Sequence, residues 1–202
     1  MYTLYHFPYS QHARRVVSLL EAAGLPYQLH HVNMAQGEHL SAAYLSINPN
    51  HQIPTLVDGD LKIHESNAIL RYLCGKHSLT DWYPADPRHR ALVDQWLDWN
   101  QCRLSPAVID IVRNKVFLKE KGDKDAVAGG EARLRELGPV LEDGLRSADF
   151  LIGATPTIAD LSVASNVFQL GLADAIPPGE RIATWYGRIS ALEAFRKSLP
   201  PR

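Results

Sequence analysis

The stretch that decides the fold is HQIPTL at residues 51–56, followed by ESNAI at residues 65–69. Pro54 stands directly before an apolar run, where a proline cannot donate to a sheet ladder. If the Ile53–Pro54 bond is cis, the chain turns sharply there and leaves the Ile53 N–H and C=O open to an extended peptide. The second segment opens a helix, whose first N–H groups and serine hydroxyl favour a carboxylate. The two segments together predict a site for a small peptide with a free carboxylate.

Short apolar runs and helical patterns alternate around this stretch, over residues 1–77. The turn DGD at residues 58–60 lies between two apolar runs, which is a hairpin signal. Apolar residues at helical spacing indicate a helix on each side of the hairpin region. The expected elements are strand Met1–His6, helix Gln11–Gly24, strand Tyr27–Val32, strands Thr55–Val57 and Leu61–Ile63, and helix Glu65–Lys76.

The remainder of the chain reads differently. Residues 78–88 are rich in Asp and Pro and lack helical periodicity, so they predict a linker. Every later segment reads helical: residues 89–120 with a bend near Pro106, then 124–147, 157–173 and 180–198. We therefore expect an α/β domain at 1–77, a linker at 78–88 and an all-helical domain at 89–202, with ligands between the two domains.

The two deciding segments and the hairpin between them resemble the glutathione-binding half of cytosolic glutathione S-transferases. The resemblance implies that the backbone of Ile53, beside Gln52 and Pro54, pairs with the cysteinyl part of glutathione. It implies that Glu65 and Ser66 hold the γ-glutamyl end. It also implies the fold, a thioredoxin-like N-terminal domain and a C-terminal helical bundle. Taken singly, each feature also fits a turn proline or a helix N-cap without any ligand.

The segment FPYSQHAR at residues 7–14 lies between the first strand and the first helix. Thioredoxin-like redox proteins carry a Cys-Pro-Tyr-Cys motif at this turn; here Phe7 and Ser10 replace the cysteines, which excludes disulfide exchange through it. The segment resembles the Ser-Gln-x-x-Arg start of bacterial and theta-like transferases, which implies that Ser10 is the hydroxyl that favours the thiolate. Ser10 is also the expected N-cap of the helix, and Tyr5 and Tyr9 remain rival hydroxyls.

A third segment, AQGEHL at residues 35–40, resembles the theta-type Gly-x-His sequence. The resemblance implies that His39 approaches the glycine carboxylate of glutathione, with Gln52 nearby. His51 stands where the family often has a lysine, a departure that weakens this part of the match. No zinc-ligand spacing is found among the nine histidines, and the adjacent pair at 30–31 points to opposite faces of a strand, so no metal is expected.

Two further features concern folding. Thr157 and Asp160 form a capping-box pattern that resembles the buried box of the transferase helical domain. Cys74 and Cys102 are expected to be reduced, small buried side chains rather than nucleophiles or a disulfide framework.

The resemblance implies a glutathione transferase that uses glutathione as co-substrate in detoxification. Its thiolate attacks a small hydrophobic electrophile whose identity the sequence does not give. Two alternatives stay open, a glutathione-dependent peroxidase and a non-catalytic interaction protein on the same fold. The candidate walls of the second-substrate site are Phe7, Tyr9, Met34, Val108, Ile111, Val112 and Lys115.

Composition limits the other partners. A net charge of −1 with scattered basic residues argues against nucleic acid and anionic membranes. No apolar stretch approaches the roughly 20 residues that span a bilayer, and no signal peptide is visible, so a cytoplasmic protein is expected. The family implies a homodimer in which an acidic residue of the partner reaches the γ-glutamyl amine. Asp98 is the candidate.

Overall fold

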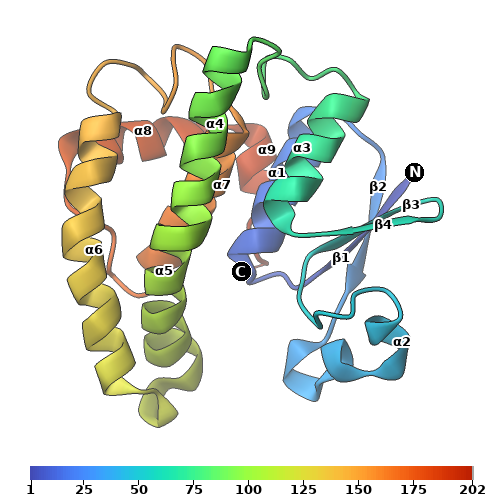
Figure 1. The fold of residues 1–202 in the computed structure, drawn as a ribbon. Helices are drawn as coiled ribbons and strands as arrows, with labels where there is room; N and C mark the ends of the chain where they lie inside the picture. The colour runs from blue at the N-terminus through green and yellow to red at the C-terminus, as the bar shows by residue number, and fades with distance from the viewer. Residues whose placement is uncertain (202) are drawn as a thin grey trace. The chain divides into compact units, whose positions relative to one another are not determined.

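The structure, a computed structural model, describes residues 1–201 in two compact units (Figure 1). One unit comprises Met1–Thr80 and the segment from Leu192 onward, and the other comprises Asp81–Ala191. The first unit contains β1 (Tyr2–His6), α1 (Gln11–Ala22), β2 (Tyr27–His31), short 3-10 turns at Met34–Gln36 and Glu38–Leu40, α2 (Ala42–Leu45), β3 (Thr55–Asp58), β4 (Leu61–His64), α3 (Ser66–Lys76) and α9 (Glu193–Lys197). The second contains the α-helices α4 (Pro87–Trp99), α5 (Ser105–Val112), α6 (Lys124–Gly144), α7 (Ile158–Gly171) and α8 (Glu180–Ala191). It also contains the π-helical stretches η3 (Asn100–Leu104) and η4 (Arg113–Leu118) and the 3-10 turn η5 (Lys119–Lys121).

The first unit is built on a four-stranded sheet in the order β2-β1-β3-β4. β1 runs parallel to β2, and the β1–β3 and β3–β4 pairs are antiparallel. Leu4 is fully buried, whereas its neighbour Tyr5 points to the opposite face, where its ring meets that of Tyr44 from α2. This arrangement is the thioredoxin-like fold that the sequence predicted.

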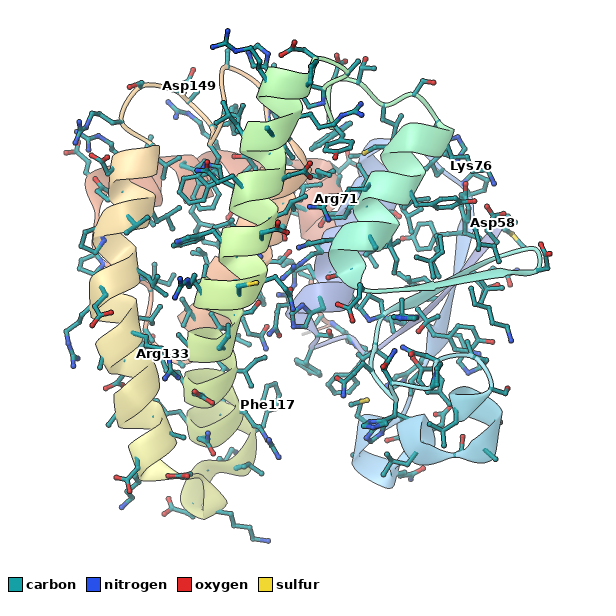
Figure 2. The ribbon with its side chains drawn as sticks, in the orientation of Figure 1. Asp58, Arg71, Lys76, Phe117, Arg133 and Asp149 are labelled. Atoms are coloured by element: carbon teal, nitrogen blue, oxygen red, sulfur yellow. The ribbon has the colours of Figure 1, made fainter. Side chains whose placement is uncertain are left out.

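One row of the sheet brings together three segments that are distant in sequence. Thr55 at the start of β3 lies opposite Tyr5 near the end of β1 and opposite His64 at the end of β4. The turn before β3, the turn after β1 and the start of α3 therefore meet at one end of the sheet. The other end of α3 is tied down separately, because Lys76 forms an ion pair with Asp58 (Figure 2).

The strands and helices of this unit lie close to their predicted limits. The first helix ends at Ala22, and Gly24 follows with φ +61°, a conformation that glycine adopts at little cost. Burial raises the pKa of the Cys74 thiol to about 12, as expected for a packed side chain. Cys102 departs from the expectation, because it is exposed.

The long helix predicted at 89–120 runs from Pro87 to Leu118 and changes its hydrogen-bonding pattern at two π-helical stretches, η3 and η4. It ends at Lys119, which has φ +51°. Ser105 N–H donates to Asn100 C=O, a π-type bond that closes the turn before Pro106. Pro106 has no backbone N–H that could continue the regular α-helical hydrogen bonds. The wider π-helical turn lies directly before the proline, so no backbone N–H is left unpaired there. The segment before Pro106 thus contains a π-helical turn, and the bend expected near Pro106 stays a prediction.

The single helix predicted at 180–198 is wrong, because the chain breaks into α8 and α9. Leu192 has extended backbone angles between them. The break allows α9 to pack on α1, where Ser18 donates a hydrogen bond to Ser198 at 2.9 Å and Lys197 lies 3.4 Å from Glu21. The segment from Leu192 onward therefore groups with the first unit, and the functional limits expected at 1–77, 78–88 and 89–202 stay predictions.

The capping box at the start of α7 is present and buried. Asp160 accepts hydrogen bonds from Thr157 N–H at 2.8 Å and from the Thr157 hydroxyl at 3.0 Å on one oxygen. Its other oxygen accepts from Leu151 N–H and from the Trp185 indole, both at 2.9 Å. One carboxylate thus joins the preceding loop, the helix start and α8.

Asp160→Asn should destabilise the protein by about 3 kcal/mol, since the amide NH₂ faces hydrogen-bond donors in either orientation. Chemical denaturation of both proteins measures this difference. Asp149→Asn, at an exposed carboxylate, is the matched control. Equal losses in the two variants would contradict the role assigned to Asp160.

Candidate functional site

Ser10 lies between β1 and α1 and caps α1. Its Oγ accepts a hydrogen bond from Ala13 N–H at 3.2 Å, and its own N–H donates to Phe7 C=O at 2.9 Å. Within residues 1–201 its hydroxyl proton is not donated to any acceptor. The capping bond uses an oxygen lone pair, so the N-cap role leaves the proton available to a ligand.

The two rival hydroxyls have different surroundings. Tyr5 is half-buried, with its ring 4.5 Å from the His30 ring and 5.9 Å from that of Tyr44. Tyr9 is 39 % exposed and its ring lies 5.7 Å from that of Phe7. Of the three candidate hydroxyls, that of Ser10 is the one at a helix N-terminus, where the helix dipole favours an anion.

The turn before β3 is held by buried side chains on both sides of Ile53–Pro54, whose peptide bond is cis. Gln52 C=O accepts hydrogen bonds from the Tyr44 hydroxyl at 2.6 Å and from Asn48 Nδ2 at 2.9 Å. The same two groups contact Thr55 Oγ1 at 3.2 and 3.1 Å. We call Tyr44, Asn48 and Thr55, with the Gln52 carbonyl, the turn clamp. In the described chain, Ile53 N–H and C=O take part in no hydrogen bond.

The start of α3 also has polar groups without hydrogen-bond partners among residues 1–201. Glu65 has φ +68° and makes no side-chain cap to the helix. Ser66 is buried, yet neither its N–H nor its hydroxyl has a partner among residues 1–201. Strained backbone of this kind costs about 1–3 kcal/mol and is concentrated at functional sites. Open N–H groups at a helix start attract an anion.

His39 and Gln52 complete the set predicted from sequence. His39 lies in the 3-10 turn Glu38–Leu40, and its Nδ1 is buried without a partner in the part of the chain that the structure describes. Glu38 fixes that turn by accepting from Asn33 N–H at 2.7 Å, a bond that lowers the pKa of the Glu38 carboxyl. Gln52 is exposed, while its carbonyl belongs to the turn clamp.

The chain matches one protein family at both ends. Residues 1–75 match the family model for the glutathione S-transferase N-terminal domain, and residues 124–197 match that for the C-terminal domain. The chain is 35 % identical to glutathione S-transferase theta-1 of Mus musculus over 190 residues, covering 90 % of this chain and 79 % of the relative. It is 31 % identical to glutathione S-transferase F10 of Arabidopsis thaliana over 204 residues, covering 96 % and 94 %.

The chain belongs to the glutathione S-transferase family. Human glutathione S-transferase T1-1, in its apo form, is similar with a TM-score of 0.90 and 31 % identity over 98 % of this chain and 87 % of that one. Glutathione transferase F2 of Populus trichocarpa is similar with a TM-score of 0.87 and 28 % identity over 98 % and 97 %. The predicted family, fold class and enzyme class, a glutathione transferase, are confirmed.

Other expectations about this transferase can be compared with the structure. Val108, Ile111 and Val112 are buried, so they are core residues and do not form accessible walls of a second-substrate site. Lys115 is exposed. Among residues 1–201, no group of three or more His, Cys, Asp or Glu side chains gathers to hold a metal, and no helix is long and apolar enough to cross a membrane.

The sequence reasoning missed the turn clamp. Neither Tyr44 nor Asn48 stands out in the sequence as a site residue. A polar Asn and a Tyr shortly before a strand-initiating proline are a signal only once their burial is known.

Asn48→Ala should raise the KM for glutathione about tenfold and destabilise the protein by about 1–3 kcal/mol, because the Gln52 carbonyl and Thr55 Oγ1 each lose one hydrogen-bond donor and the turn loosens. Steady-state kinetics with varied glutathione and thermal denaturation measure the two effects. Ser46→Ala, at an exposed serine, should change neither. A stability loss with an unchanged KM would confine the clamp to folding.

Proposed function

We propose that glutathione binds along the end of the sheet where the three open segments meet. Its cysteinyl backbone pairs with the N–H and C=O of Ile53, next to Pro54. Its γ-glutamyl carboxylate binds at Glu65 and Ser66. The observation that carries this placement is that the Ile53 backbone and the Ser66 N–H and hydroxyl are all without partners among residues 1–201. His39 and Gln52 bind the glycine end, where the unpartnered His39 Nδ1 offers a hydrogen-bonding group.

Ser10 is the proposed thiolate stabiliser. Its hydroxyl donates to the glutathione sulfur while its oxygen continues to accept from Ala13 N–H. A free thiol with a pKa of about 8.5 is only a few per cent thiolate at pH 7. Lowering that pKa by about two units costs about 2.7 kcal/mol and makes the thiolate the major form. A charge-assisted hydrogen bond and a helix N-terminus together supply a stabilisation of this size.

The proposed reaction is nucleophilic attack by the thiolate on an electrophilic carbon of a small hydrophobic molecule. A C–S bond forms, and either a leaving group departs with its electron pair or the resulting anion takes a proton from water. Peroxide reduction needs the same activated thiolate, so peroxidase activity is the second candidate. We further propose a cytoplasmic homodimer, as the family resemblance implies.

Ser10→Ala should raise the pKa of bound glutathione by about two units and lower the rate at pH 6.5 about 50-fold, as the thiolate fraction falls from about one half to about one hundredth. Ultraviolet absorbance of the thiolate against pH measures the pKa directly. Stability should fall by only about 1 kcal/mol, the value of an N-cap.

Ser10→Thr retains a hydroxyl and a capping group, so it is the matched control and should keep a low thiol pKa. If Ser10→Ala leaves the thiol pKa unchanged while Tyr5→Phe or Tyr9→Phe raises it, the stabilising role belongs to that tyrosine. If glutathione does not bind to the unaltered protein, the proposed function itself fails.

A further inference from the structure

Arg15, in α1, carries a positive charge that no carboxylate of the described chain neutralises. Its side chain is 0 % exposed, and its Nη1 donates one hydrogen bond, to Asn67 Oδ1 at 3.2 Å. Its Nε and Nη2 have no hydrogen-bond partner among residues 1–201, and Arg15 forms no ion pair there. A buried cation without a counter-charge is strongly unfavourable in a folded protein.

The surroundings of Arg15 add to this cost. Arg14, the preceding residue, is also buried, and both arginines follow closely on the N-terminus of α1, where the helix dipole is itself positive. Burial, and then the charge of Arg14, lower the pKa of Arg15 to about 9. Arg15 therefore stays protonated at neutral pH, and the ligand-free protein contains an uncompensated interior charge.

The one bond that Arg15 makes leads to the open start of α3. Asn67 directly follows Ser66, whose N–H and hydroxyl have no partner in the described chain, and Glu65 leaves the first turn of α3 without a side-chain cap. The positive potential of the guanidinium adds to that of the α3 N-terminus at this point. In a protein interior such charges act on one another more strongly than in water.

We infer that Arg15 is a positioning residue for glutathione, whose buried charge acts through Asn67 so that the first turn of α3 selects the γ-glutamyl carboxylate. The bound carboxylate is the counter-charge that the chain itself lacks. This inference rests on the proposed placement of the γ-glutamyl end at Glu65 and Ser66. The Arg15 charge then lowers the stability of the ligand-free protein and raises its affinity for glutathione. A residue with only a packing role does not show this combination.

The first test is Arg15→Met, which removes the charge and keeps most of the side-chain volume. The melting temperature of the ligand-free protein should stay the same or rise, because replacing a buried unpaired charge by an apolar group is neutral or stabilising. The KM for glutathione should rise about tenfold while kcat changes less than about twofold. Arg15→Lys retains a charge and should restore most of the affinity. Arg146→Met, at an exposed arginine, is the matched control and should change neither quantity.

The second test removes the counter-charge from the ligand. γ-Aminobutyryl-cysteinyl-glycine lacks only the γ-glutamyl carboxylate. It should bind the unaltered protein about tenfold more weakly than glutathione does, and Arg15→Met should weaken its binding no further. Isothermal titration calorimetry with both peptides completes the cycle.

Several results would overturn the inference: a lower melting temperature with unchanged glutathione affinity, an equal loss of affinity for both peptides, or no rescue by lysine. Ser66→Ala separates this failure from that of the proposed function. If Ser66→Ala weakens glutathione binding and Arg15→Met does not, only the role of Arg15 is wrong. If neither variant affects binding, the γ-glutamyl end is misplaced.

Discussion

The turn clamp is the constraint on which the site depends. The Gln52 carbonyl takes both Tyr44 and Asn48 as donors, and the same two side chains reach Thr55 beyond the proline. Buried polar groups of this kind stabilise only when each has its partner, and then they fix a single backbone path. Here the fixed path leaves the Ile53 backbone open. The fold thus satisfies its internal polar groups around the turn and leaves the N–H and C=O of Ile53 for a ligand.

The same contrast between hydrogen-bonded groups and groups without partners is found along this end of the sheet. Ser10 Oγ accepts the hydrogen bond that caps α1 and keeps its proton, whereas the Ser66 N–H and hydroxyl at the start of α3 have no partner among residues 1–201. Sheet register brings both helix starts to the row formed by Tyr5, Thr55 and His64. Two helix N-termini and the open backbone N–H and C=O of Ile53 suit a small peptide with two negative groups, a thiolate and a carboxylate. Arg15 fits this pattern as a buried cation for which residues 1–201 supply no counter-charge.

Much of the fold could be predicted from the sequence, because several of its signals act locally. The DGD turn, the glycine after the first helix and the Thr157–Asp160 box each act within a few residues, so their outcome follows from the residues themselves. Contacts between residues far apart in the sequence could not be predicted. The break at Leu192, which lets α9 pack on α1, and the Arg15–Asn67 bond both depend on tertiary neighbours. Apolar periodicity likewise did not distinguish core from pocket, since Val108, Ile111 and Val112 are core residues.

We propose that the unpartnered N–H groups at the end of the sheet form the glutathione site. The most direct measurement is a titration of isotope-labelled protein with glutathione, followed through backbone amide resonances. The account predicts that the amides of Ile53 and Ser66 shift downfield and exchange more slowly with solvent, because each gains an acceptor. Saturating glutathione that leaves both amides unmoved and shifts resonances elsewhere would contradict it.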